Sequence, residues 1–301
     1  MKRIPAIVLV LLAIISVQFG ASVARTQFEI VGPLGATFLR LVFAALILLV
    51  VLRPKVRHWP AKSWLAAGAL GVALAGMNTM IYLAFETVPL GVAVTIEFLG
   101  PLTLALAQTR RILDALWALL ALAGVLLLGL DGGNNGSIAL VGLLFAAGAG
   151  TFWAMYILAS ARVGKAIPGI DGLAVGLAIA AVISAPLGFG PASAAVGNPT
   201  VLLVFVAVAI LSSAIPYAFE LEALRRLPTR VFGILSSLGP AVAALAGLLV
   251  LGQALGLSEV IALACVTVAS IGVTVATSRN RARQVTAGGP GLETAAGIDG
   301  S

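Results

Sequence analysis

Long apolar runs separated by short polar segments dominate the pattern along the chain. A helix needs about 20 apolar residues to cross the hydrocarbon core of a bilayer, and by this measure the runs predict ten transmembrane helices. The connections are short and rich in turn formers such as Gly132 and Gly133, which leaves no room for a soluble domain. The pattern therefore predicts an all-α integral membrane protein. The expected helices are residues 4–24, 34–52, 63–84, 90–109, 113–130, 138–160, 170–190, 199–221, 231–252 and 257–277.

The composition supports a membrane protein and excludes a soluble globular one. Hydrophobic residues make up 61% of the 301 residues, charged residues only 10%, and the mean hydropathy is +1.14. Ordinary soluble domains are about 25% charged, so these charges cannot coat a particle of this size. The pI of about 10.3 does not indicate a nucleic-acid partner here, because the basic residues fall between apolar runs, where they orient a protein in the bilayer.

Basic residues are concentrated in every second connection of the ten predicted helices. Because cytoplasmic loops carry the excess of Lys and Arg, both termini are predicted to be cytoplasmic. An alternative is that the first run is a cleaved signal peptide, since small residues lie near Ala24. The basic residues on the predicted cytoplasmic side are Lys2, Arg3, Arg53, Lys55, Arg57, Lys62, Arg110, Arg111, Arg162, Lys165, Arg225, Arg226, Arg230, Arg279, Arg281 and Arg283.

One segment of the chain recurs. Pro89-Leu90-Gly91 through Leu99-Gly100-Pro101 is echoed by Pro228-Thr229-Arg230 through Leu238-Gly239-Pro240, with the same spacing between the prolines. The shift between the copies predicts two five-helix repeats, and because five is odd the second repeat must be inverted in the membrane. Inverted repeats are typical of transporters that alternate between two open states. The predicted units are residues 1–132, residues 138–277, and a disordered cytoplasmic tail at residues 278–301.

Each copy of the repeated segment places a proline inside a predicted helix. Proline removes a backbone donor and loosens the helix around it. Because Pro101 and Pro240 occupy matched positions, we predict that both are hinges of a conformational change. The alternative is a pair of static kinks that shape helix packing.

Four polar residues from four predicted helices share one depth. Arg40 and Glu97 are expected roughly 10 Å below the outer interface at 1.5 Å per residue, with Asn78 and Gln18 at a similar level. One interpretation is structural: the two charges neutralise each other and the amides hold helices together. The other is a zwitterion site, in which Arg40 binds a carboxylate, Glu97 an ammonium group or a coupling proton, and the amides a polar side chain.

The second half offers other candidates for lining a cavity. Its aromatic residues could form a wall, although Trp and Tyr also belong at lipid interfaces, and one serine occupies the position equivalent to Glu97. Glu220 and Glu222 are interpreted as interfacial partners of Arg225 and Arg226. The cavity candidates are Trp153, Tyr156, Tyr217 and Ser236.

The inventory of reactive groups does not favour an enzyme. The single histidine, His58, lies in a basic loop, so no Ser-His pair within the membrane is supported. The sequence contains no Walker-type glycine loop, and its Cys, His and carboxylate residues form no pattern typical of a metal site. No metal and no cofactor are therefore expected, and a secondary carrier remains.

Several stretches together resemble the threonine and homoserine exporter branch of the drug/metabolite transporter superfamily, built from two EamA domains. They are Val17-Gln18-Phe19-Gly20-Ala21-Ser22, Leu39-Arg40-Leu41, Gly76-Met77-Asn78 through Tyr82, Thr87-Val88-Pro89-Leu90-Gly91-Val92-Ala93-Val94, Glu97-Phe98-Leu99-Gly100-Pro101 and Leu227-Pro228-Thr229-Arg230-Val231-Phe232-Gly233.

The resemblance covers residues 4–277 and implies two inverted five-helix halves around a central cavity in the bacterial inner membrane. It also implies efflux of small amino acids, and we expect this export to be coupled to proton inflow. The expected partners are an amino-acid substrate, protons and the lipid bilayer. A drug, nucleoside or other metabolite exporter of the same fold, or a passive facilitator, is the alternative.

Overall fold

The computed structural model describes residues 4–107, 112–135, 139–167, 169–224, 226–227 and 235–287, and the regular structure of these residues is helical. Six of the helices in this described part are long and apolar enough to cross a membrane, and shorter apolar helices accompany them. The prediction of an all-α architecture is confirmed.

The first half of the chain contains helices that begin at prolines and one helix that breaks in its middle. Pro5, Pro60 and Pro89 directly precede α1, α3 and α4, where the missing N–H costs nothing. The expected helix 90–109 is divided at Phe98 into α4 and α5. The helices are α1 (Ala6–Arg25), α2 (Phe28–Leu52), the short η1 (Val56–His58), α3 (Ala61–Thr87), α4 (Leu90–Glu97), α5 (Leu99–Ala107) and α6 (Ile112–Asn135).

The second half contains one π-helical turn. The helix before this turn, α9, is capped by Asn198, whose side chain accepts a hydrogen bond from the backbone N–H of Val201. Gly252 ends α12 with a left-handed φ of 67°. The last helix continues past residue 277 as far as Ala287, into the segment expected to be a disordered tail. The helices are α7 (Leu140–Ala166), α8 (Asp171–Ala192), η2 (Ser193–Ala195), α9 (Pro199–Ala209), the π-helical η3 (Ile210–Ala214), α10 (Ile215–Leu224), α12 (Gly239–Leu251) and α13 (Leu257–Ala287).

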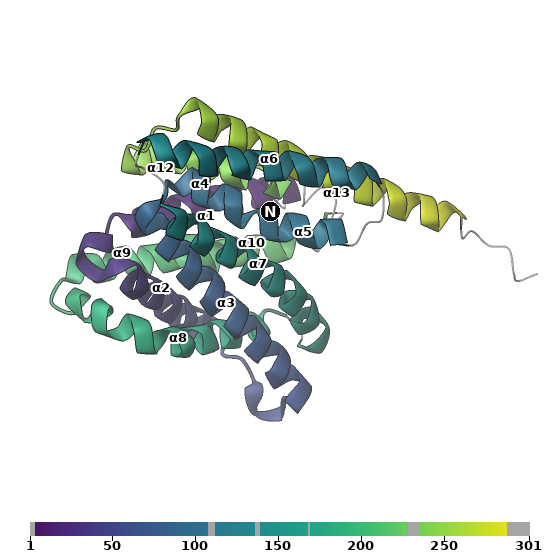
Figure 1. The fold of residues 1–301 in the computed structure, drawn as a ribbon. Helices are drawn as coiled ribbons and strands as arrows, with labels where there is room; N and C mark the ends of the chain where they lie inside the picture. The colour runs from purple at the N-terminus through teal and green to yellow at the C-terminus, as the bar shows by residue number, and fades with distance from the viewer. Residues whose placement is uncertain are drawn as a thin grey trace, which may run out of the picture.

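Helices from the two halves of the chain pack extensively on each other. The pairs α2 and α8, α4 and α12, and α6 and α13 are in contact, as are α3 with α7 and α1 with α10. Figure 1 shows α6 and α13 together on one flank, α2, α3 and α8 toward the other, and α1, α4, α7 and α10 between them. The centre of the bundle is therefore built jointly by both halves.

Close helix crossings use glycine where no side chain would fit. A Cβ atom added to Gly100 on α5 would lie 1.8 Å from the carbonyl oxygen of Gly150 on α7. No atom can be accommodated at that distance, so the pair fixes where the α4–α5 break crosses α7. The outer surface is different in kind, because large apolar side chains such as Val182 point outward with 73% of their surface exposed. Such a surface suits contact with lipid.

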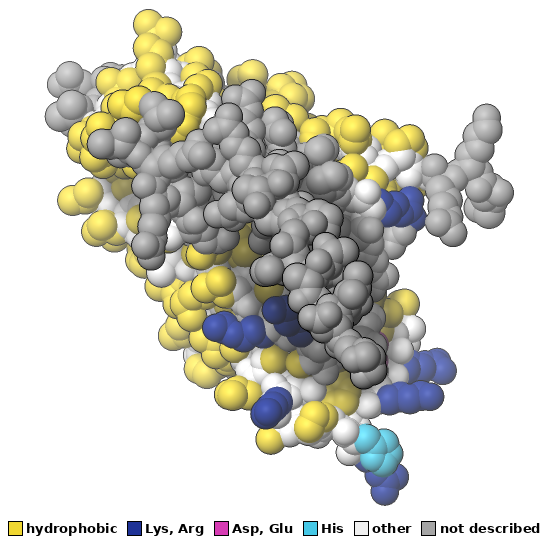
Figure 2. Space-filling view, turned by 90° about the vertical axis from the view of Figure 1, so that its right-hand side faces the viewer, with side chains coloured by type: hydrophobic (Ala, Val, Ile, Leu, Met, Phe, Trp, Pro, Cys, Tyr) yellow, Lys and Arg dark blue, Asp and Glu magenta, His cyan; other side chains and the backbone are white. Residues whose placement is uncertain are grey.

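Basic side chains mark one end of the bundle. Figure 2 shows Lys and Arg side chains gathered mainly over the lower part of this face, near a histidine side chain. The exposed residues Arg53, Lys55 and Arg57 follow the end of α2 there. These described basic residues therefore lie together at one end of the bundle, which is called the basic end below.

Candidate functional site

Arg40 is the best-anchored charge in the interior. This α2 residue is only 4% exposed, and its NH2 group donates to the backbone carbonyl of Ser212 at 2.7 Å while Nε donates to the Ser213 hydroxyl at 3.3 Å. In an α-helix the Ser212 carbonyl would bond the N–H of residue 216, but that residue is Pro216, which has none. The proline therefore frees an acceptor in the π turn, and the guanidinium of Arg40 uses it.

Tyr82 completes the surroundings of the guanidinium. Its hydroxyl accepts from NH1 of Arg40 at 3.3 Å, and the guanidinium carbon lies 5.5 Å from the ring centroid, a cation–π distance. The ring is fully buried and packs against Phe28 and Phe85 with centroid distances of 5.7 and 5.8 Å. The sequence analysis did not select Tyr82 as a site residue. Its spacing of four from Asn78 was the available signal, because residues at i and i+4 share a helix face.

Asn78 and Tyr217 bring the two halves of the chain together. The buried Asn78 amide donates to the Leu74 carbonyl at 2.8 Å, and its side chain also interacts with the Tyr217 hydroxyl. The Tyr217 ring lies 6.0 Å from that of Tyr156 on α7. These contacts place Tyr156 and Tyr217, both expected to line a cavity, beside a polar residue of the first half.

Glu97 is the last residue of α4 and is 8% exposed. Pro101, four residues later, cannot supply the N–H that would bond the Glu97 carbonyl, and that oxygen instead lies against α7, where a Cβ on Gly150 would approach it to 2.6 Å. The neighbouring Phe98 ring meets Trp153 edge-on at 5.3 Å. A proline, a glycine and an aromatic pair therefore determine the position of this carboxyl group.

The charges of Arg40 and Glu97 interact through space rather than by direct contact. Within the described part of the chain neither an ion pair nor a hydrogen bond joins them, although the guanidinium acts electrostatically on the carboxyl group. Both charges also act on the Tyr217 hydroxyl. The three groups consequently belong to one electrostatic cluster, in which no direct ion pair joins the two full charges among the described residues.

Glu220 also acts electrostatically on this cluster, an interaction that the sequence analysis did not predict. It is half-buried on α10, one turn beyond Tyr217, and its carboxyl group acts electrostatically on both Tyr156 and Tyr217. Arg226 donates a hydrogen bond to the Ile4 carbonyl at 3.2 Å, while residue 225 lies outside the described residues. The spacing of three from Tyr217 was the available signal, because residues at i and i+3 share a helix face. The interfacial pairing of Glu220 stays a prediction.

The other candidates lie apart from these contacts. Gln18 is half-buried on α1 and forms no hydrogen bond with any described residue, whereas its neighbour Ser16 donates to the Leu211 carbonyl at 2.6 Å. Ser236 is half-buried, and it is the next residue, Ser237, whose hydroxyl bonds Ser270 at 2.9 Å.

The two predicted hinge prolines both lie in the first turn of a helix. Pro101 lies at the start of α5 and is half-buried, and Pro240 lies at the start of α12 and is buried. Residues 228–234, which begin the second copy of the repeat, lie outside the described residues. The two prolines thus follow interruptions in their helices, at Phe98 for the first and at residues 237–238 for the second.

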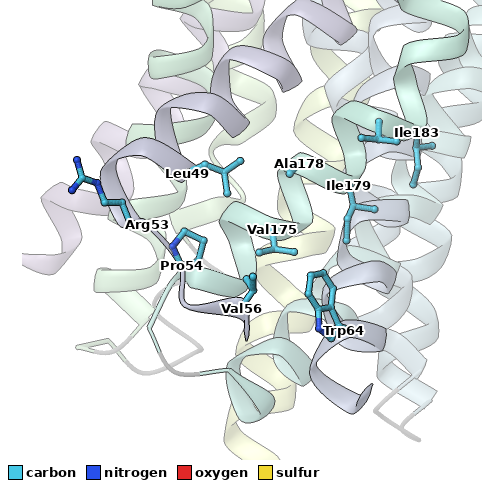
Figure 3. A pocket seen from close by; sticks show the side chains of 10 residues that line it. Leu49, Arg53, Pro54, Val56, Trp64, Val175, Ala178, Ile179 and Ile183 are labelled. Carbon is cyan, nitrogen blue, oxygen red and sulfur yellow. The ribbon is translucent and has the colours of Figure 1, made fainter. Parts of the chain in front are cut away.

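A cavity of about 600 Å³ lies elsewhere, on the flank of the bundle (Figure 3). Its lining is apolar except for Arg53 and includes none of the cluster residues. No group of three His, Cys, Asp or Glu residues suited to a metal ion occurs among the residues that the structure describes.

Comparison with known proteins identifies the family. Residues 140–275 match the EamA-like transporter family. The chain is 43% identical over 269 residues to the threonine/homoserine exporter RhtA of Escherichia coli, covering 89% of this chain and 91% of that protein. It is 42% identical over 273 residues to the protein of the same name from Salmonella typhimurium, covering 91% and 92%. The chain belongs to the EamA-like transporter family.

This EamA-like transporter is a multi-pass membrane protein, as the apolar runs predicted, and the resemblance inferred from its motifs is confirmed. A solved crystal structure that is 20% identical in sequence matches this fold with a TM-score of 0.61. The match covers 91% of this chain and 98% of the other chain. That likeness supports the helical fold. The family consists of transporters, and the relatives of this chain named above are exporters, not enzymes.

Proposed function

We propose that this protein exports small amino acids of the threonine and homoserine type across the bacterial inner membrane, in exchange for protons. The observation that carries the proposal is the 42–43% identity, over about nine tenths of the chain, to proteins named threonine/homoserine exporters. The buried cluster around Arg40 is the part of the structure suited to such a substrate.

The cluster offers a complementary group for each part of a hydroxy amino acid. The substrate carboxylate binds Arg40, three of whose five N–H donors are used by described residues. The ammonium group binds Glu97, and the substrate hydroxyl bonds the Asn78 amide or the Tyr217 hydroxyl. We place the zwitterion between the guanidinium and the carboxyl group, because no direct ion pair of the described residues occupies either charge.

Antiport follows from competition at one carboxyl group. A protonated Glu97 cannot attract an ammonium group, and a Glu97 that holds an ammonium group is not free to take a proton. If the carrier reorients only with either the substrate or a proton bound, export of substrate requires entry of a proton.

Glu220 is a second carboxyl group that can carry a proton, and it lies toward the basic end. We propose that it passes protons to or from Tyr217 and its neighbours.

Alternating access is proposed to arise from two inverted repeats, residues 1–132 and 138–277, with ten membrane crossings and both termini in the cytoplasm. The packing of α2 on α8 and of α6 on α13 supports a two-fold relation, because the shift between the repeated segments pairs these same helices. In the present conformation Arg40 and Glu97 are both buried, so substrate entry requires movement, with Pro101 and Pro240 as the hinges.

The test is uptake of labelled threonine and homoserine into inside-out membrane vesicles with an acidic lumen. Accumulation above that of vesicles lacking the protein, and its collapse by a protonophore, is the expected result. Equilibration without accumulation would instead make the protein a facilitator. An absence of any protein-dependent uptake would exclude both substrates, and competition with drugs and nucleosides would then test the other exporters of this fold.

A further inference from the structure

The flank cavity is an apolar groove between three helices. It lies where the end of α2, the η1 turn and the start of α3 meet the side of α8 (Figure 3). Its volume of about 600 Å³ falls within the range of sites that hold small molecules. The side chains that form its apolar wall are Leu49, Val56, Trp64, Val175, Ile179 and Ile183.

The groove runs along the lipid-facing surface of the bundle. From Val175 to Ile183 the α8 helix rises by about 12 Å at 1.5 Å per residue, so the wall extends from the basic end well into the hydrocarbon region. Val182 of the groove is 73% exposed, and Leu65, next to Trp64 in the chain, is 76% exposed. An apolar groove in this position is filled by a hydrocarbon chain more favourably than by water.

Positive charge and aromatic rings surround the mouth of the groove. Arg53 stands at the rim, and its guanidinium extends outward from the groove in Figure 3. The backbone N–H of this left-handed residue (φ 48°) bonds the Leu49 carbonyl at 2.9 Å, which ends α2 and fixes the position of Arg53. Lys55 is exposed two residues later. The rings of Trp59 and Trp64 lie 5.6 Å apart, and paired aromatic residues are typical of the membrane interface.

We propose that this groove binds one anionic phospholipid of the surrounding bilayer, with an acyl chain along α8 and the phosphate group at Arg53. Basic residues at a membrane surface attract anionic headgroups, and the apolar wall accounts for the chain. The lipid bridges α2 and α8, the helix pair whose first member also carries Arg40. The proposal does not depend on the identity of the transported substrate.

Native mass spectrometry of the purified full-length protein tests it, in detergent with equal amounts of phosphatidylglycerol and phosphatidylcholine added. The wild type is expected to retain one phosphatidylglycerol molecule in preference to phosphatidylcholine. Ala178→Trp fills the groove and should remove this adduct. Arg53→Asn keeps a residue that tolerates the left-handed backbone and should lower the preference about fivefold, the effect of losing one basic residue near an anionic lipid.

Matched controls separate the groove from general lipid binding. Leu187→Trp enlarges an outward-facing residue of the same helix outside the groove, and Arg162→Asn removes an exposed charge of α7; both should retain the adduct. Equal retention of the two lipids by the wild type, or wild-type retention by Arg53→Asn, overturns the proposed headgroup contact. Loss of the adduct in Leu187→Trp to the same degree as in Ala178→Trp overturns the groove as its site. Arg53→Asn keeps the test decisive should Ala178→Trp fail to fold.

Discussion

The side chains of Asn78 and Tyr217 meet in the interior, and the shift that carries Pro89 onto Pro228 also carries Asn78 onto Tyr217. Two equivalent positions of a pair of repeats can touch only near the axis that relates them. An axis of an inverted repeat lies in the membrane plane, so a contact on it is close to the midplane. If the two halves are inverted repeats, as proposed, the cluster of Arg40, Glu97 and Tyr217 lies near the midplane, where a transporter with alternating access has its binding site.

Replacing Glu97 with Gln should abolish accumulation driven by a proton gradient and should also weaken exchange of labelled for unlabelled substrate, because the neutral amide attracts an ammonium group no better than a protonated Glu97 does. The amide keeps the size of the side chain and its place at the end of α4 but cannot bind a proton. Uptake and exchange in proteoliposomes measure the two activities separately. Glu86→Gln, at an exposed carboxyl group of α3, is the control and should behave as wild type. Undiminished accumulation in Glu97→Gln would contradict the coupling role.

Replacing Arg40 with Lys should weaken substrate binding by roughly 10- to 100-fold. A lysine keeps the charge but cannot reach the Ser212 carbonyl, the Ser213 hydroxyl and Tyr82 together, and a hydrogen bond to a charged group contributes about 1.5–3 kcal/mol. Binding of labelled substrate to purified protein provides the measurement. Ser213→Ala, which removes only the 3.3 Å bond, should have a smaller effect. Similar affinity in Arg40→Lys and wild type would show that charge alone is sufficient.

Replacing Pro216 with Ala should reduce transport, by about fivefold if the Arg40 hydrogen bond loses roughly 1 kcal/mol. Alanine restores the N–H that can bond the Ser212 carbonyl within the helix, and this N–H then competes with the guanidinium. Initial rates of uptake at matched protein levels measure the effect. Pro186→Ala, at an exposed proline inside α8, tests whether any helical proline has the same consequence, and it should leave transport unchanged.

Replacing Glu220 with Gln distinguishes an interfacial role from a place in the cluster. If Glu220 exchanges protons with the tyrosine pair, accumulation should fall several-fold and its dependence on lumenal pH should change. If it serves only as a surface partner of Arg226, transport should stay at the wild-type level. The pH profile of uptake is the decisive measurement, because a loss of stability alone would lower activity equally at every pH.

Replacing Gly100 with Ala should destabilise the fold by more than about 3 kcal/mol, beyond the usual cost of an overpacked side chain. The new Cβ would lie 1.8 Å from the Gly150 carbonyl oxygen, so α5 and α7 would have to separate. Thermal unfolding in detergent, followed by size-exclusion chromatography, detects this change. Gly68→Ala on α3 meets no atom within 4 Å and should keep or slightly raise the stability.

Much of the fold was predictable because it depends on local properties. The apolar length of each run decides whether it can span a bilayer, and the helices found here coincide with the expected runs to within a few residues at most ends. The break at Phe98 and the π turn before Pro216 were harder to predict, because each depends on a residue that is distant in the chain. The break lies where α4 and α5 cross α7 at Gly150. In the turn, the Ser212 carbonyl accepts a hydrogen bond from Arg40. The division into two inverted repeats stays a prediction, supported by the pairs of helices in contact.

The candidate site was only partly predictable. Arg40, Glu97 and Asn78 were recognisable because polar groups inside a membrane are costly. Tyr82 and Glu220 were not selected, because a tyrosine and a glutamate near a helix end are unremarkable until the neighbouring helices are placed. Gln18 shared the expected depth, yet it contributes no hydrogen bond to the described part of the cluster, because depth along a helix does not specify the direction in which a side chain points.

The sequence by itself determined that this chain is a helical membrane protein of the EamA-like transporter type, since hydropathy, charge and short motifs are properties of neighbouring residues. Only the tertiary structure decided that the Arg40 guanidinium bonds a carbonyl 172 positions away, and that no hydrogen bond or ion pair joins it to Glu97 in the described part of the chain. The physical reason is that a buried charge takes the acceptors that helix packing brings within reach, and this packing depends on glycine crossings and proline breaks in both halves.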